Sequence, residues 1–276
     1  MEFRKIVIPY SSKTEWFNII PIGDIHLGHA GCDIKYLKDL IKYVEDKENT
    51  FWIGMGDYCE FINYSDPRFD PKNVLSKYLT AGDIDKMVQL QIDDLVDMLM
   101  PIRDKCIGLL RGNHEEAVRK HYHYDVLYEL AKDLDLSRDL LLYDIANVRL
   151  VFRRQVNGKK LPSHVYDVVC AHGNVGGRTY GYKANRISQL KQWFIADIYL
   201  LAHSHIKLAQ TSNLIYFDYR GNQRKKKIIE AYTGCFLRGY EKSKTSYVEK
   251  WLYPPTDIGV VKIMLHPESG DKHVSL

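Results

Sequence analysis

Short apolar segments alternate with amphipathic segments along the chain up to Ile206. The apolar segments are rich in β-branched or aromatic residues, which is typical of buried strands. They span Phe17–Ile22, Thr50–Met55, Cys106–Leu110, Tyr166–Ala171 and Ile198–Ala202. The amphipathic segments between them predict helices over Ile34–Lys47, Asp83–Met100, Tyr124–Asp133 and Ala184–Ala196. This alternation predicts an α/β fold.

After Ile206 the pattern changes to strand-like segments that are separated by polar turns. The segments are LIYFDYR, KIIEAYTGCF and IGVVKIML, and Gly221-Asn222 marks one of the turns. We therefore expect an antiparallel or mixed arrangement of strands in the second half of the chain.

Residues 58–82 have no clear period and contain two Asp-Pro steps, Asp66-Pro67 and Asp70-Pro71. Such steps disfavour a helix, so this segment predicts a long excursion from regular structure. Long ordered loops beside active sites often act as lids over the substrate. A surface loop without function is the alternative, and the sequence leaves both open.

The length and composition predict one ordinary globular domain. A chain of 276 residues lies near the upper limit for one hydrophobic core, so we expect a single domain over residues 1–276. A hydrophobic fraction of 45% and a charged fraction of 27% exclude a disordered or collagen-like chain. The net charge of +4 permits phosphate-rich partners but does not by itself indicate nucleic-acid binding.

Cysteine usage and hydropathy predict a cytoplasmic protein without a membrane partner. The five cysteines are far apart and form no CxxC pair, which favours reduced thiols over a disulfide framework or a zinc knuckle. No apolar run approaches the ~18 residues that cross a bilayer, and the first residues do not resemble a secretion signal.

Polar side chains that can bind metals follow each of the five predicted strands. They are Asp24 and His26, Asp57, Asn113 and His114, His172, and His203 and His205. Side chains just beyond the carboxyl ends of strands converge on one crevice in α/β sheets, so we expect these residues to meet. Gly23, Gly56 and Gly112 precede three of the groups and allow sharp turns and close backbone approach.

These residue types suit a divalent transition metal. One histidine after an apolar run is ordinarily a hydrogen-bonded core or loop residue, but the same coincidence after several strands favours a site. Carboxylate, imidazole and amide groups bind manganese, iron or zinc, and imidazole favours these metals over magnesium or calcium.

The order and spacing of these residues resemble the motifs of the calcineurin-like metallophosphoesterase family. The family motifs D-x-H, G-D, G-N-H-D/E, H-x and G-H-x-H correspond to Gly23-Asp24-Ile25-His26, Gly56-Asp57, Gly112-Asn113-His114-Glu115, His172-Gly173 and Ala202-His203-Ser204-His205. The resemblance implies a four-layer α/β/β/α sandwich with mixed sheets and an active site at the C-terminal ends of the strands. Ala202 stands where the family has glycine, a small residue that should preserve the ligands.

The resemblance also implies a dinuclear metal centre. Asp24, His26 and His205 would hold one cation, Asn113, His172 and His203 would hold the other, and Asp57 would bridge both. Mn²⁺ is the first choice, with Fe, Zn, Ni and Mg left open. His114 would donate a proton to the leaving oxygen.

Four further residues are candidates for substrate contact. Arg111 could grip a phosphate with two hydrogen bonds, and its alternative is a solvated surface arginine. Arg178 and Lys183 lie in the glycine-rich segment from Gly173 to Arg186, which could approach a phosphate or serve as a plain linker. His29 is expected either at the crevice or at the start of the following helix.

A phosphodiesterase or nuclease acting on nucleic acid or a nucleotide is the first functional hypothesis. The Asp57 segment continues as Tyr58-Cys59-Glu60 and lacks the Asp-Arg-Gly of the family's protein phosphatases, so that activity is not expected. The alternatives are a phosphomonoesterase acting on a small phosphorylated metabolite and a catalytically silent metal-binding interaction module. The sequence leaves the oligomeric state open.

Overall fold

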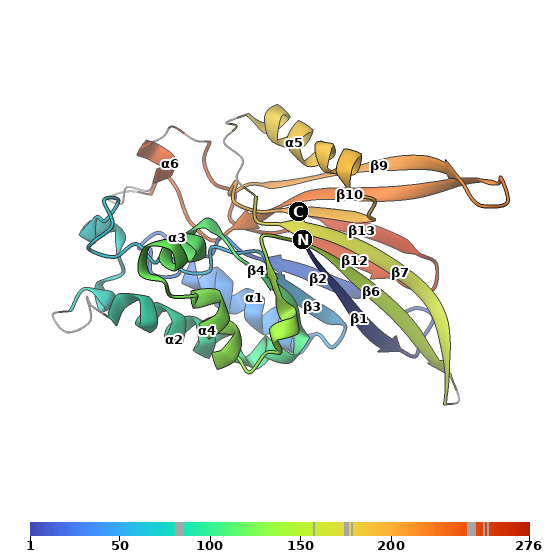
Figure 1. Ribbon diagram of the computed structural model, residues 1–276, viewed down its shortest axis with the longest axis horizontal. Helices are drawn as coiled ribbons and strands as arrows, with labels where there is room; N and C mark the ends of the chain where they lie inside the picture. The colour runs from blue at the N-terminus through green and yellow to red at the C-terminus, as the bar shows by residue number, and fades with distance from the viewer. Residues whose placement is uncertain are drawn as a thin grey trace.

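The computed structural model has two β-sheets stacked face to face, with helices on their outer faces (Figure 1). It describes residues 1–80, 86–156, 158–173, 177, 179–241, 247–250, 252 and 254–276. This arrangement confirms the predicted α/β sandwich with mixed sheets. In the described residues no helix combines the length and the apolar character that crossing a membrane requires.

The first sheet has six strands in the order β13-β12-β2-β3-β4-β5. Their bounds are β2 Phe17–Ile22, β3 Thr50–Gly54, β4 Cys106–Leu110, β5 Leu141–Tyr143, β12 Lys262–His266 and β13 Asp271–Ser275. The neighbours from β2 to β5 are parallel, whereas β12 pairs antiparallel with both β2 and β13. The predicted strands Phe17–Ile22 and Cys106–Leu110 have the expected bounds.

The second sheet has seven strands in the order β1-β6-β7-β8-β10-β11, with β9 paired to β10. Their bounds are β1 Glu2–Tyr10, β6 Ile145–Val156, β7 Lys159–Ala171, β8 Ile198–Leu201, β9 Lys207–Phe217, β10 Gln223–Cys235 and β11 Gly259–Val260. β8 is parallel to β7 and β10, whereas the β6–β7 and β9–β10 pairs are antiparallel. The expected mixed arrangement of the second half is therefore confirmed.

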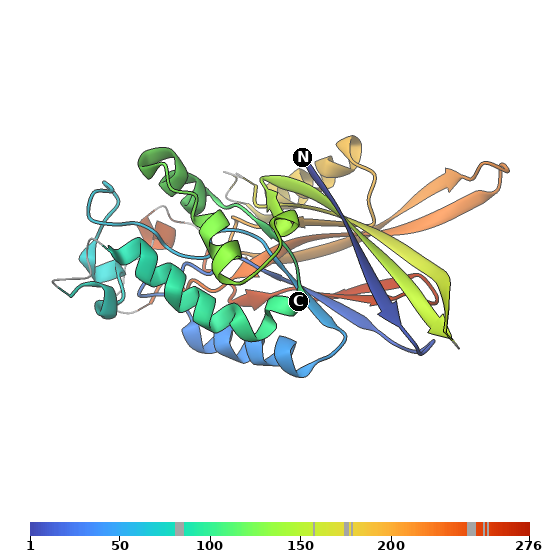
Figure 2. The same cartoon turned by 60° about the horizontal axis from the view of Figure 1, so that its bottom comes forward.

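The helices are α1 Ile34–Asp46, α2 Met87–Leu99, α3 Asn113–Tyr122, α4 Val126–Asp133, α5 Tyr180–Trp193 and α6 Tyr247–Lys250. Figure 2 shows α1 and α2 side by side on the outer face of the six-stranded sheet. The four predicted helices are present, but α5 begins at Tyr180 instead of Ala184 and ends at Trp193. The sequence did not predict α3.

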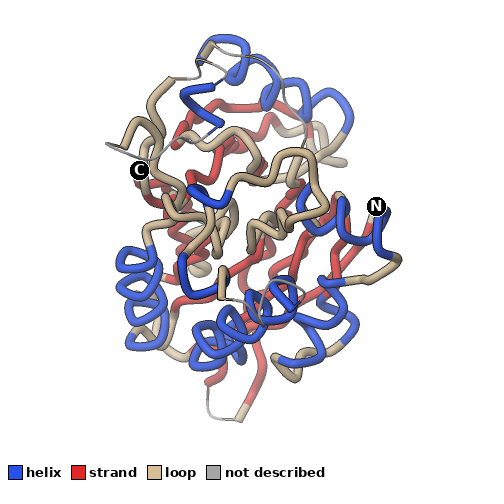
Figure 3. Tube along the Cα trace, turned by 90° about the vertical axis from the view of Figure 1, so that its left-hand side faces the viewer, coloured by secondary structure: helices blue, strands red, loops and turns tan. Residues whose placement is uncertain are grey.

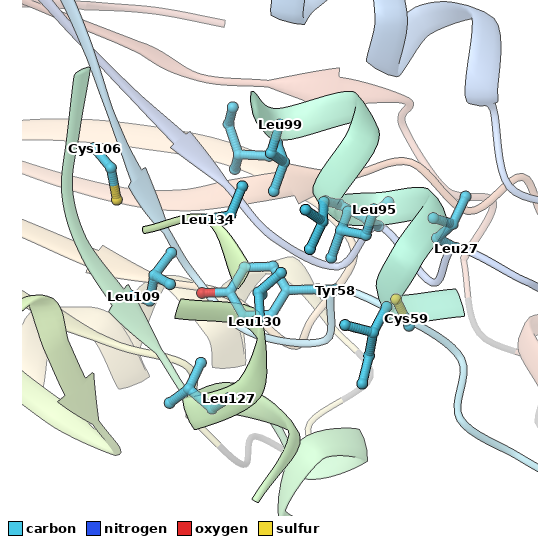
Figure 4. Packing of buried hydrophobic residues seen from close by; sticks show 14 of the residues in the cluster. Leu27, Tyr58, Cys59, Leu95, Leu99, Cys106, Leu109, Leu127, Leu130 and Leu134 are labelled. Atoms are coloured by element: carbon cyan, nitrogen blue, oxygen red, sulfur yellow. The ribbon is translucent and has the colours of Figure 1, made fainter. Parts of the chain in front are cut away.

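Buried hydrophobic layers hold the sandwich together, and one of them lies between α5 and the seven-stranded sheet. Between the sheets, side chains such as Phe17, Ile53, Val168 and Ile229 are almost completely buried. Outside the six-stranded sheet, Tyr58 packs among leucines from β4, α2 and α4 (Figure 4), and its hydroxyl donates to the Leu110 carbonyl at 2.9 Å. Burying one such side chain stabilises a fold by about 1.5–3 kcal/mol, so these layers fix the strand ends rigidly.

The carboxyl ends of β2, β3, β4, β7 and β8 lie on the same side of the molecule. Figure 3 views the molecule from this side and shows loops gathered between the outer helices. Within residues 58–80 the structure has two short 3-10 helices, Pro71–Asn73 and Ser76–Tyr78. Phe61, Val74 and Tyr78 anchor this excursion because they are buried.

Candidate metal centre

The backbone turns sharply directly after the strands that carry the candidate ligands. Residues with left-handed backbones are Asp24, His26, Asp57, His203 and His205, with φ values of 49°, 51°, 52°, 66° and 52°. This conformation costs a residue other than glycine about 1–3 kcal/mol and clusters at functional sites. The packed strands below must supply that stabilisation, and the turns direct several ligand side chains to one place.

Two glycines let the turns after β3 and β4 lie in contact. A Cβ atom on Gly56, whose φ is 90°, would lie 2.5 Å from the Gly112 nitrogen. A Cβ atom on Gly112 would lie 2.2 Å from Asp57 Oδ1. The close backbone approach that the sequence predicted is therefore confirmed at these positions.

One group of candidate ligands consists of Asp24, His26 and His205. The Nε2 atoms of His26 and His205 are 3.2 Å apart, and His205 Nε2 is 3.5 Å from Asp24 Oδ1. All three residues are buried, and one ligand atom from each lies within 4.8 Å of the others. This geometry can surround one cation.

A second group lies beside the first and contains Asp57, Asn113, His172 and His203. Asn113 Oδ1 is 3.2 Å from His172 Nε2 and 2.8 Å from His203 Nδ1. Asp57 Oδ2 is 3.2 Å from His172 Nε2 and 3.9 Å from His26 Nε2 in the first group. Asp57 therefore lies between the two groups, where the sequence placed it.

The donor atoms of the site fit divalent metals. The backbone nitrogens of His203 and His114 donate to Asp24 Oδ2 and Asp57 Oδ1, at 2.8 and 2.9 Å. The other oxygen of Asp24, Oδ1, is buried and has no hydrogen-bond partner among the described residues. At most one of two imidazole nitrogens 3.2 Å apart can be a donor to the other. A cation would bind the electron pairs of Asp24 Oδ1 and of the imidazole nitrogens, as in metal sites with mixed nitrogen and oxygen ligands.

Partners behind the ligands fix their orientation, and the sequence did not reveal them. Glu60 Oε2 is 2.8 Å from His26 Nδ1, and the Met55 carbonyl is 2.7 Å from His172 Nδ1. In both cases the outer nitrogen is engaged, so Nε2 can turn to a metal. Glu60 is separated from His26 by 34 positions, and no local pattern connects them.

Glu115 joins the turns after β3 and β4. Its carboxylate accepts hydrogen bonds from the backbone nitrogens of Asp57, Tyr58 and Gly112, at 2.9, 2.9 and 2.7 Å. Its position three residues after the N-cap Gly112 of α3 is the capping-box position, which is a local signal for this role. In the sequence, Glu115 stands out only as the last residue of the Gly112-Asn113-His114-Glu115 motif.

The buried charges shift the acidity of the site. Burial alone would lower the pKa of the His172 ring, but the carboxylates of Asp57 and Asp24 raise it to about 10. Burial likewise opposes ionisation of Glu60, yet the rings of His114 and His26 lower its pKa to about 2. At neutral pH the Glu60 carboxylate is therefore ionised, and the His172 ring holds a proton that an incoming cation must displace.

A cavity of about 500 Å³ opens above the ligands. The expected residues His29, His114 and Lys183 all line it, together with Arg68 and Asn73 from the excursion. His114 and Lys183 are only 6% and 5% exposed. The structure thus brings together the seven expected ligands, the expected proton donor and two of the expected substrate contacts.

Two other expected contacts are not at the cavity or cannot be placed. The Arg111 guanidinium pairs with Asp125 at 3.2 Å and Glu116 at 3.5 Å and lies over the Tyr143 ring. These two carboxylates neutralise the Arg111 charge, and Arg111 is not among the residues that line the cavity. We therefore do not assign it a role in catalysis or substrate binding. Arg178 lies outside the described residues.

Comparisons with known proteins identify a family. The model of the family described as calcineurin-like phosphoesterase matches residues 17–207, which is more than half of the chain and includes every expected ligand. No curated protein matches the chain.

Solved structures that match the chain are distant in sequence. A metallophosphoesterase from Sphaerobacter thermophilus is 12% identical, with a TM-score of 0.38 and coverage of 94% of this chain and 86% of that one. A protein of Streptococcus pneumoniae described as a predicted phosphoesterase is 10% identical, with a TM-score of 0.33 and coverage of 91% and 84%. The NAD nucleotidase of Haemophilus influenzae is 10% identical, with a TM-score of 0.41, and 95% of this chain matches 49% of that one.

Proposed function

The chain belongs to the calcineurin-like phosphoesterase family and is a metal-dependent hydrolase, and from this premise we propose that it hydrolyses phosphodiester bonds in nucleic acid or a nucleotide. The observation that carries the proposal is the pair of adjacent ligand groups, with Asp57 between them, at the floor of a cavity. Such a site offers cations for a phosphate and space for the groups attached to it.

We assign two divalent cations to this centre, with Mn²⁺ as the first choice. Asp24, His26 and His205 would hold one, Asn113, His172 and His203 the other, and Asp57 both. When bound, such cations would polarise phosphoryl oxygens and lower the pKa of water. Fe, Zn, Ni and Mg remain alternatives.

His114 would act as the proton donor to the leaving oxygen. Its Nδ1 is held by the Glu60 carbonyl, which leaves Nε2 for proton transfer. Burial disfavours the protonated ring, but the charges of Asp57 and Glu60 raise the pKa of His114. The ring can therefore hold a second proton for the leaving group.

The cavity favours a diester over a monoester. Besides its polar floor, the cavity has apolar walls from Ile62, Val74, Ile206, Val248 and Pro254. A nucleoside attached to the phosphate could pack against these walls, whereas a small monoester would leave them uncovered. The mixed lining supports the phosphodiesterase hypothesis.

A phosphomonoesterase acting on a small metabolite is the second candidate, and Lys183 is the observation that favours it. The Lys183 ammonium donates to the Ser204 carbonyl at 3.2 Å and forms no ion pair with any residue in the described ranges. A buried cation without a carboxylate suits the second charge of a monoester. Lys183 contacts the substrate phosphate in either case.

Residues 58–80 belong to the proposed substrate pocket. Arg68, Asp70 and Asn73 of this segment line the cavity, so we propose that the segment closes over bound substrate.

A cytoplasmic location is also proposed. It is supported by the five cysteines, whose thiols are free.

The test is a substrate panel with Mn²⁺ that contains bis-p-nitrophenyl phosphate, p-nitrophenyl phosphate, and labelled DNA and RNA. We expect the diesters to be hydrolysed faster than the monoester. The variant Asp57→Asn should lose this activity, and Asp104→Asn, which removes an exposed carboxylate, should retain it. Faster monoester hydrolysis would favour the second candidate. A metal-loaded protein inert on every ester would identify a silent binding module.

A further inference from the structure

The hairpin of β9 and β10 projects from the sandwich as a two-stranded ribbon (Figure 1). β10 pairs with β8 from Ile229 to Tyr232, whereas its pairing with β9 extends outward to Gln223. Residues 213–227, which we call the outer hairpin, therefore lie beyond the strands of the sheet. Isolated two-stranded hairpins are only marginally stable in water, so a ribbon of this length suits a segment that binds something.

One face of β10 changes character where it leaves the sandwich. Ile229 and Ala231 are buried in the core between the sheets. Lys227 and Lys225 follow on the same face, because side chains two positions apart in a strand point the same way. The register places Asn213 and Ile215 of β9 opposite these lysines. The face is thus apolar inside the sandwich and cationic outside it.

The outer hairpin concentrates positive charge. It contains five arginines and lysines and one carboxylate, Asp218, and its formal charge of +4 equals that of the whole chain. On the opposite face Arg224 pairs with Asp218 at 2.9 Å, and Lys226 pairs with Asp197 at 3.2 Å. Lys225 and Lys227 form no ion pair within the part of the chain that the structure describes. Their charges are available to an external anion.

Aromatic rings stand beside these cations at the end of the ribbon. Phe217 is 69% exposed and Tyr219 is 90% exposed. The Arg220 guanidinium lies 5.2 Å from the centre of the Tyr219 ring. Exposed rings among cations are the combination by which proteins bind single-stranded nucleic acid, since rings stack on bases while cations contact phosphates.

We propose that the outer hairpin is an arm that binds single-stranded nucleic acid, with Lys225 and Lys227 on the phosphates and Phe217 and Tyr219 on the bases. Charge complementarity selects this occupant. A second copy of the chain paired along β9 would bury the apolar residues but would bring another hairpin of formal charge +4 beside the first. Strand binding by the outer hairpin does not depend on the proposed function. Only the inference that the bound strand is also the substrate rests on that function.

The arm connects directly to the metal centre. β9 begins at Lys207, two residues after His205, and the Cys235 thiol at the end of β10 lies 3.7 Å from the His205 carbonyl. β10 has 13 residues and at about 3.3 Å per residue spans roughly 40 Å. Phosphates of a strand stacked as in a duplex are about 3.4 Å apart, so roughly 12 nucleotides cover that length, and an extended strand needs fewer. Longer strands can therefore contact the arm and the cavity together.

The experiment measures fluorescence anisotropy of labelled single-stranded DNA and RNA of about 24 nucleotides, with a chelator present so that no strand is hydrolysed. The variant Lys225→Ala/Lys227→Ala should bind at least about tenfold more weakly, and the slope of log K against log salt should decrease by about 1.4. Lys13→Ala/Lys38→Ala, which removes two exposed lysines elsewhere, should stay within about twofold of the parent protein. Tyr219→Ala should weaken binding by about tenfold, and Tyr219→Trp should restore it.

Equal affinities of the parent protein and the lysine variant would overturn the proposal, as would a parent protein that binds neither strand. A dimer in light scattering that Phe217→Ala dissociates, with strand binding unchanged, would instead assign this face to a second copy. Hydrolysis of bis-p-nitrophenyl phosphate by the same variants separates the two proposals, because the arm does not touch so small a substrate. An inactive parent protein that still binds strands through the arm would refute the proposed function alone.

Discussion

The metal centre and the outer hairpin use charge in opposite ways. At the metal centre, most of the charged and polar groups are buried, and several of them lie on backbones bent into a strained conformation. On the outer hairpin, Lys225 and Phe217 are exposed on a regular ribbon. Buried polar groups that contact one another depend on one another, so replacing one of them also weakens the contacts of its neighbours. Exposed charges contribute separately, and salt screens them. The comparison predicts that single substitutions have larger effects at the metal centre than on the outer hairpin.

Replacing Asp57 should have the largest effect. Asp57→Asn removes the charge that lies between the two ligand groups, so both cations should bind more weakly. Changing an outer partner of a ligand typically costs about 10–100-fold in metal affinity, and the loss here should exceed that range. Elemental analysis after gel filtration measures it, and two full equivalents of metal in the variant would contradict the bridging role.

His114→Ala should lower turnover and leave the metals in place. Loss of a general acid typically costs about 10²–10⁴-fold in rate. The cost should be greatest for nucleic-acid substrates and least for p-nitrophenyl esters, whose leaving group needs little protonation. Steady-state rates on both substrates test this difference, and an equal loss on both would remove His114 from proton transfer.

Glu60→Gln should weaken the first cation more than the second. Glu60 contacts His26 Nδ1, and substitution of such an outer partner costs about 10–100-fold in metal affinity. Titration calorimetry should resolve one weakened and one unchanged step. Equal weakening of both steps would mean that Glu60 stabilises the whole site instead of orienting His26.

Metal binding should strengthen as pH rises. Without a bound cation, the pKa of His172 is about 10, so the ring is protonated at pH 7 and must lose that proton to become a ligand. Below that pKa, the affinity should rise about tenfold per pH unit for each proton released. Calorimetry in buffers of different ionisation enthalpy counts the protons. An affinity independent of pH would mean that no proton leaves His172 when the cation binds, which would contradict a raised pKa of this ring.

The smallest effect is expected from Phe217→Ala. The ring is 69% exposed, and surface substitutions usually change the free energy of unfolding by no more than about 0.5 kcal/mol. Chemical denaturation measures the change. A loss as large as that from a core substitution would mean that the outer hairpin is covered in the folded protein, and the contrast with the metal centre would disappear.

Periodicity and motif spacing predicted the parts of the fold that depend on local pattern. β2 and β4 have the predicted bounds because their apolar runs are buried on both faces. The helix α3 was missed because its residues, NHEEAVRKHY, carry one strongly apolar side chain and no hydrophobic period. Its first two residues are the proposed ligand Asn113 and the proposed proton donor His114, so the same positions serve the proposed site and begin the helix.

The sequence located the candidate ligands of the site but not the residues that lie behind them. Strand ends in parallel neighbours meet at one edge, so Asp24, Asp57 and Asn113 could be placed together from order alone. Glu60 contacts His26 across a long loop, and the pairing of Arg111 with Asp125 depends on how α3 and α4 pack. Such contacts between distant segments follow from tertiary packing, which single positions do not encode.

The most direct test of the central claim is a crystal structure of the protein with Mn²⁺ and its anomalous difference map. The account predicts two peaks about 3.5–4 Å apart, both in contact with the Asp57 carboxylate, one beside His26 and His205 and the other beside His172 and His203. A single peak, or peaks that do not contact Asp57, would contradict it.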